Sequence, residues 1–180
     1  IETDEIDGFA VTRGPGSFTG LRIGLSCIKG LAYAKDKPVV SVSSLETLAT
    51  QAALVPWNFN SLTICSLLDA RKREVYFAGF EQENTKLIQV KPEMVLPAEK
   101  LFFHIQGRCL FIGDGAILYK DVLTRLFKDN AHFMPPQHNY IRAHSIALLG
   151  YQHFKSGNID DLSALAPKYI RKSDAEFKVS

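Results

Sequence analysis

The sequence changes from a short apolar run to a helical pattern at residues 14–24, which read GPGSFTGLRIG. Residues 8–12, just before this stretch, are apolar enough for a buried strand. Apolar side chains then recur with helical spacing over residues 17–34. Because glycine and proline between two such segments are typical of a tight turn, we predict a strand, a turn and a helix in that order.

The turn is also a candidate anion-binding site, formed by Gly14, Gly16, Ser17 and Gly20. A glycine-rich turn that leads into a helix leaves backbone N–H groups that can hold a phosphate. Two nucleotide-binding fingerprints fail: a Walker A loop needs Lys after its last glycine, where Leu21 stands, and a dinucleotide site needs another glycine spacing. The glycines are equally consistent with a sharp turn that binds nothing.

The predicted helix has apolar side chains on two sides. Leu21, Leu25 and Ile28 form one side, and small residues accompany further apolar ones on the other. An interior glycine costs about 1 kcal/mol relative to alanine, so close approach of another helix is expected to offset that cost. The candidate partner-binding residues are Phe18, Leu21, Ile23, Gly24, Cys27 and Leu31.

The rest of the chain predicts an α/β fold. After a second strand at residues 39–42, parallel to the first, a helix covers residues 44–53. Beyond a turn-rich break, the order is three strands, helix, strand, helix, strand, helix, which is typical of a ribonuclease-H-like unit. We therefore expect residues 1–56 to belong to a first lobe, 57–160 to a second, and 161–180 to an irregular tail.

The composition limits the class of protein. With 180 residues, 46% of them hydrophobic, the chain can bury a sizeable core. The net charge of +2 is spread along the chain, which argues against a surface for long nucleic acid. No apolar run reaches the roughly 18 residues of a membrane span, so we expect a soluble, cytoplasmic protein without membrane association. Three cysteines and five histidines lack metal-site spacing, and we expect no metal.

One acidic residue keeps an enzymatic interpretation open. Asp69 ends a predicted strand, and a carboxylate at that position could bind Mg²⁺ in an actin-like nucleotide hydrolase. A charged hairpin tip at residues 69–73 explains it equally well. Asp114, between two glycines ahead of a predicted helix, fits a helix cap.

Five blocks of sequence resemble, in order, the bacterial TsaB family, also called YeaZ. They are GPGSFTGLRIGLSCIKGLA at residues 14–32, VSVSSLETLA at 40–49, DARKREVY at 69–76, GDGA at 113–116 and APKYIRKSDAE at 166–176. The resemblance implies an actin-like fold of two ribonuclease-H-like lobes. The family's opening strands and first helix have no counterpart here, so the first lobe is expected to be N-terminally truncated.

The resemblance also implies a function. Family members serve the synthesis of N6-threonylcarbamoyladenosine at position 37 of tRNAs that read codons beginning with A. By this resemblance, the chain is expected to be a non-catalytic scaffold that pairs with the transferase TsaD and lets the ATPase TsaE join. We accordingly expect no catalytic residue and no cofactor, and contact with tRNA only through the complex. A homodimer through the same helix, a glycoprotease-like peptidase and a nucleotide hydrolase are the alternatives.

Overall fold

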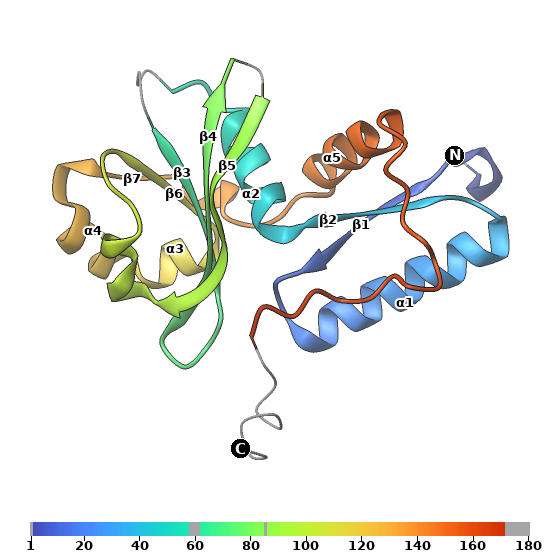
Figure 1. Ribbon diagram of the computed structural model, residues 1–180, viewed down its shortest axis with the longest axis horizontal. Helices are drawn as coiled ribbons and strands as arrows, with labels where there is room; N and C mark the ends of the chain where they lie inside the picture. The colour runs from blue at the N-terminus through green and yellow to red at the C-terminus, as the bar shows by residue number, and fades with distance from the viewer. Residues whose placement is uncertain (1, 58–61, 85, 172–180) are drawn as a thin grey trace.

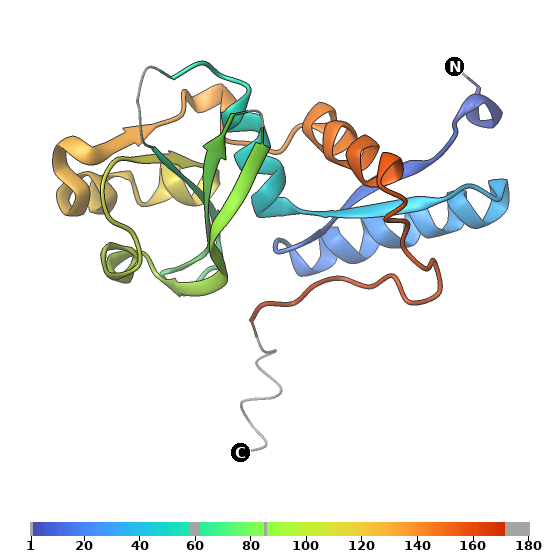
Figure 2. The ribbon, with the colours of Figure 1, turned by 45° about the horizontal axis from the view of Figure 1, so that its top comes forward.

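The computed structural model describes residues 2–57, 62–84 and 86–171. Two sheets stand side by side, and helices cover both faces of each (Figure 1). Figure 2 shows the same two sheets, still side by side, after a rotation. The two sheets with their helices are called the first and second lobe below.

The first sheet pairs β1 (Phe9–Gly14) with β2 (Val39–Ser43) in parallel, as predicted. Helix α1 (Phe18–Lys35) connects the two strands. A short 3₁₀ turn, η1 (Thr3–Glu5), precedes β1 in the chain. Parallel strands need such a crossover, because a tight turn can join only antiparallel neighbours. Leu25 and Ala32 of α1 pack on the sheet with Val39.

The second sheet has five strands in the order β5-β4-β3-β6-β7. The antiparallel strands are β3 (Thr63–Asp69), β4 (Glu74–Glu83) and β5 (Lys86–Pro97). The strands β6 (Cys109–Ile112) and β7 (Ala131–Phe133) then continue parallel to β3. This three-strand meander followed by two parallel strands is the ribonuclease-H-like order expected from the sequence.

The helices differ from the prediction in detail. The sequence predicted one helix between the last two strands of the second half, whereas the structure has two helices there, α3 (Asp114–Leu118) and α4 (Lys120–Phe127), which meet at Tyr119. The segment after β5 forms the 3₁₀ helix η2 (Ala98–Phe103), and two short 3₁₀ turns, η3 (Lys128–Asn130) and η4 (Pro136–His138), flank β7. Helix α2 (Ser44–Ala53) has the predicted range, and α5 (Ala143–Lys155) is the predicted final helix.

The packing exchanges two helices between the lobes. Although α2 follows β2 in the chain, its buried side, with Leu45 and Leu48, packs on the second sheet with Ala78, Phe80 and Leu110. Conversely, α5 ends the second run of strands but packs on β1 and β2. The strands of the first sheet lie before residue 56 and those of the second sheet after it, whereas α2 and α5 each pack on the other sheet. The division of the chain at residues 56 and 57 stays a prediction. Chain order alone cannot show which apolar sheet a helix will cover.

The segment after α5 is irregular in backbone but packed. Residues 156–171 return along the first lobe and lie beside α1 (Figure 1). Leu165 is 8% exposed and belongs to the core between α1 and the first sheet. Of the predicted tail, residues 161–171 are thus part of the folded structure, and residues 172–180 lie outside the described residues.

Candidate functional site

The start of α1 is built by Ser17. Its backbone is non-helical, and its Oγ accepts a hydrogen bond from the Gly20 N–H at 3.2 Å. This is the usual way in which a serine satisfies one of the unpaired N–H groups at a helix start. No acidic residue lies in the first turn.

The glycines of the turn have separate structural roles. Gly14 has φ +116°, and a Cβ there would come within 2.8 Å of the Lys168 backbone oxygen. Gly14 is therefore required by the turn and by the close approach of the C-terminal segment. The N–H of Gly20 is already used by Ser17. The anion-binding site at Gly14, Gly16, Ser17 and Gly20 stays a prediction.

These residues line a cleft of about 720 Å³ between the lobes. One wall comes from the turn and the first residues of α1, including Gly16, Ser17 and Phe18, and the other includes Asp69 and Tyr140. Asp69 is occupied within its own turn: Oδ1 accepts the Arg71 N–H at 2.9 Å, and Oδ2 lies 3.2 Å from the Arg71 guanidinium. This arrangement matches the hairpin-tip interpretation of Asp69.

Asp114 does not cap α3, contrary to the prediction. It is the first residue of that helix, after Gly113, and its Oδ1 accepts the Asp69 N–H at 3.0 Å. Its side chain thus connects the end of β3 to the start of α3. Within the described ranges, no three His, Cys, Asp or Glu side chains gather as a metal-binding group. The helices of the described chain include none with the length and hydropathy to cross a bilayer.

The outer face of α1 exposes apolar side chains to solvent. Ile23, Cys27 and Leu31 follow one another at four-residue spacing and therefore share one side of the helix. Ile23 is 65% exposed and Leu31 40% exposed. On this side, a Cβ added to Gly24 or to Gly30 would meet nothing within 4 Å. The neighbouring Tyr33 is 84% exposed and widens the apolar surface.

Two of the predicted partner-binding residues lie elsewhere. Leu21 is 9% exposed and faces inward, where its Cδ1 is near Gly14, so it is not available to a partner on the outer face. Phe18 is 53% exposed but stacks on Tyr169, with ring centroids 5.4 Å apart. The Arg22 guanidinium lies 3.8 Å from the centroid of the Phe18 ring. We define the outer face of α1 as Ile23, Gly24, Cys27, Gly30 and Leu31.

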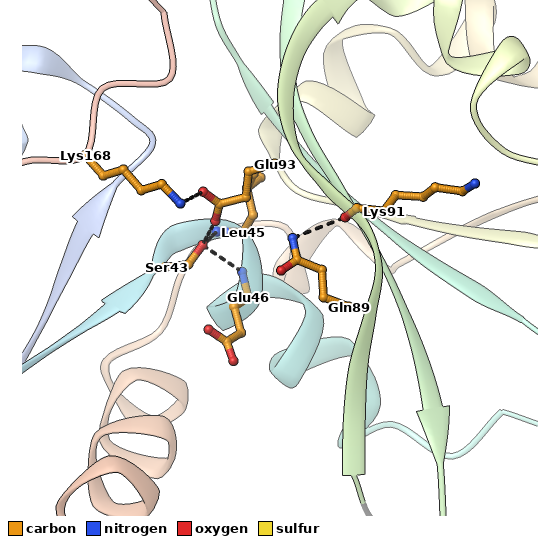
Figure 3. A network of polar contacts seen from close by, with 7 residues as sticks. All are labelled: Ser43, Leu45, Glu46, Gln89, Lys91, Glu93 and Lys168. Carbon is orange, nitrogen blue, oxygen red and sulfur yellow. Dashed lines mark hydrogen bonds and ion pairs between the residues drawn. The ribbon is translucent and has the colours of Figure 1, made fainter. Parts of the chain in front are cut away.

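A polar junction between the lobes was not anticipated from the sequence. Glu93 on β5 accepts a hydrogen bond from the Ser43 hydroxyl, and its second oxygen lies 2.8 Å from Lys168 Nζ (Figure 3). Ser43 Oγ also accepts the N–H groups of Leu45 and Glu46, and thereby caps α2.

The comparisons with known proteins agree with this architecture. A family model described as "TsaD: tRNA N6-adenosine threonylcarbamoyltransferase" matches residues 1–179. The solved structure "YeaZ from Pseudomonas aeruginosa" superposes with a TM-score of 0.74 at 23% identity, over 94% of this chain and 76% of that one. The fold and the match define a two-lobed, actin-like protein of the class that this family model describes.

Two curated relatives narrow the class further. The chain is 32% identical to "tRNA threonylcarbamoyladenosine biosynthesis protein TsaB" of Bacillus subtilis (strain 168), over 97% of this chain and 73% of that protein. It is 29% identical to the Escherichia coli (strain K12) protein of the same name, over 97% of this chain and 75% of the relative. The chain belongs to the TsaB family.

Proposed function

We propose that this chain is a non-catalytic subunit in the biosynthesis of tRNA N6-threonylcarbamoyladenosine, which pairs with TsaD and allows TsaE to join. The two TsaB relatives, which are named as tRNA threonylcarbamoyladenosine biosynthesis proteins, support the assignment to this pathway. The match to the model of the transferase itself supports a shared ancestry with the catalytic partner. Pairing through the outer face of α1 is the physical core of the proposal.

The main support for pairing through this face is the presence of two glycines, Gly24 and Gly30, where an added Cβ would contact no other atom of the described chain. Gly24 and Gly30 each cost about 1 kcal/mol of helix stability relative to alanine. Among the residues that the structure describes, no packing contact offsets this cost, because a Cβ at either position would meet no atom within 4 Å. Small residues beside Ile23 and Leu31 instead allow a second helix to approach closely and bury both apolar side chains.

A partner of the same fold would present an equivalent helix. Two related lobes can then meet around an approximate two-fold axis, with each α1 packed against its counterpart. The same geometry allows a homodimer of this chain when the partner is absent. The heterodimer is favoured in the complex if the two different faces complement each other better than either complements itself.

Reconstitution tests the role. Purified TsaD and TsaE are incubated with tRNA, threonine, bicarbonate and ATP, with and without this protein, and modified adenosine is quantified. We expect product only when the protein is present, and neither peptidase nor ATPase turnover by the protein alone. Steady hydrolysis by the repurified chain that is lost in Asp69→Ala would favour the enzymatic alternative.

A variant pair tests the surface. Ile23→Glu places a charge in the middle of the outer face, whereas Leu118→Glu makes the same change on α3, where the leucine is 59% exposed. A buried unpaired charge costs several kcal/mol, so Ile23→Glu should weaken association with TsaD by at least about tenfold. Leu118→Glu should bind as the parent does. Equal affinity of both variants would place the interface elsewhere.

A further inference from the structure

Residues 160–171 form a strap fastened to the first lobe. The Asp160 N–H donates to the Val39 carbonyl at 2.9 Å, and the Lys168 N–H donates to the Arg13 carbonyl at 2.7 Å. Between these points, Lys29 Nζ of α1 donates to the Leu165 carbonyl at 3.1 Å. The strap thus follows β2, α1 and β1 in turn, and Figure 1 shows it running the length of α1.

The end of the strap crosses to the second lobe. Lys168 Nζ lies 2.8 Å from Glu93 Oε2 on β5, and Figure 3 shows this side chain reaching across from the first-lobe side. Arg171 Nη2 lies 2.8 Å from Glu74 Oε2 on β4. Arg171 Nη1 also donates to the Ala70 carbonyl at 2.8 Å. Two cations of one short segment therefore bind two carboxylates of the other lobe.

These ion pairs are partly shielded from water. The Glu93 side chain is 9% exposed, and those of Arg171 and Glu74 are 24% and 28% exposed. The Lys168 side chain is 47% exposed, so both pairs keep one side open to solvent and a high salt concentration can still weaken them. Glu93 also accepts from Ser43, the last residue of β2, so its carboxylate contacts the first lobe through two separate segments.

An aromatic contact anchors the strap beside the cleft. Tyr169 stacks on Phe18, and its hydroxyl accepts a hydrogen bond from Arg22 Nε at 2.9 Å. Phe18 belongs to one wall of the cleft, and Ala70, which binds Arg171, belongs to the other. The strap therefore connects the two walls within three residues of chain, from Tyr169 to Arg171.

We propose that the strap is a latch that holds the two lobes at a fixed angle and so sets the width of the cleft. The contact between α2 and α5 joins the two lobes at a second place and acts as the hinge. The Lys168–Glu93 and Arg171–Glu74 pairs join them at the strap. Release of the latch lets the lobes rotate about the hinge, a common mode of domain motion.

Spin-label distance measurements test the latch in the full chain. One label is placed at Gln152→Cys on α5 and the other at Arg125→Cys on α4, in a Cys27→Ser background. Both sites are exposed, and Cys65 and Cys109 are fully buried, so labelling is specific. The parent is expected to give one narrow distance distribution. Lys168→Ala with Arg171→Ala should broaden it and shift its mean.

The matched control removes two positive charges at positions outside the strap. Lys155→Ala with Lys100→Ala, two exposed lysines, should leave the distance distribution as in the parent. Tyr169→Ala should release the strap from α1 without changing its charges, and should also broaden the distribution. An unchanged distribution in both strap variants, with circular dichroism showing the fold intact, would overturn the proposal.

A salt titration of the labelled parent covers the case in which the strap variants fail to fold. Raising the sodium chloride concentration to about 1 M shortens the screening length to about 3 Å and weakens partly exposed ion pairs. We expect the distribution to broaden reversibly under these conditions. No change on adding salt, together with unfolded variants, would show that the strap stabilises the fold without holding the lobe angle.

Discussion

Gly150 of α5 lies directly against Ala10 of β1: a Cβ on the glycine would come 2.4 Å from the Ala10 Cβ and 3.2 Å from a methyl group of Val40. The helix can therefore approach the first sheet only because this position has no side chain. Without that approach, α5 could not pack on β1 and β2 of the first lobe.

Gly150→Ala should therefore destabilise the chain. Overpacking of this kind typically costs about 1–3 kcal/mol, which outweighs the gain of about 1 kcal/mol in helix propensity. Gly30→Ala is the matched control, since a Cβ there meets open space, and it should stabilise the isolated chain by up to about 1 kcal/mol. Urea unfolding of both variants measures the difference, and effects of the same sign would contradict the packing argument.

Ser43→Ala should cost more than the loss of an ordinary helix cap. Removing the hydroxyl ends the cap of α2, worth about 0.5–2 kcal/mol, and also leaves one oxygen of the nearly buried Glu93 without its donor. Ser17→Ala removes a capping serine that is exposed. Chemical denaturation should show the larger loss for Ser43→Ala, and equal losses would mean that the bond to Glu93 contributes nothing.

One of the three cysteines should react in the folded chain. Cys27 is exposed on α1, while Cys65 and Cys109 are fully buried. Burial also raises the pKa of the Cys65 thiol well above its ordinary value, which keeps it protonated and unreactive. A thiol-reactive chromophore should count one group under native conditions and three after unfolding.

The same reagent gives a footprint of the proposed interface. Because Cys27 lies on the outer face of α1, saturating TsaD should slow its modification strongly. Full-rate labelling of Cys27 in a complex that co-purifies intact would exclude this face as the contact surface.

The stability contributed at Glu46 should depend on pH. Burial is the main cause that raises the pKa of this carboxyl, Glu93 adds to it, and His153 and Arg13 act in the opposite direction. Because the folded pKa lies above the unfolded one, ionisation of Glu46 opposes folding. Its favourable contribution is complete below the unfolded pKa, near 4.5, and is lost as the pH rises through the folded pKa.

Glu46→Gln should accordingly gain stability relative to the parent between about pH 4 and pH 7. Thermal unfolding of both proteins across this range measures the difference. Glu99→Gln, at an exposed position on η2, controls for the change in net charge. A difference between Glu46→Gln and the parent that stays constant with pH would contradict the assigned burial effect.

The local patterns of the sequence predicted most of the elements. The glycine turn before α1, the break before β3 and the spacing of apolar residues indicated strands and helices within a few positions, because these signals act over a few residues. Ile23, Cys27 and Leu31 were among the partner-binding candidates on this helix, but the sequence did not show which of its apolar residues point outward.

Contacts between distant segments were decided by the tertiary structure alone. The sequence placed α2 with the first lobe and α5 with the second, and each packs on the opposite sheet. It included Leu21 among the partner residues, although that side chain is buried. It also treated residues 161–180 as a tail, whereas Lys168 and Arg171 bind carboxylates on the second lobe. Periodicity shows which residues share one face of a helix or strand. Which other segment packs on that face depends on the shape and charge of segments that are distant in the sequence.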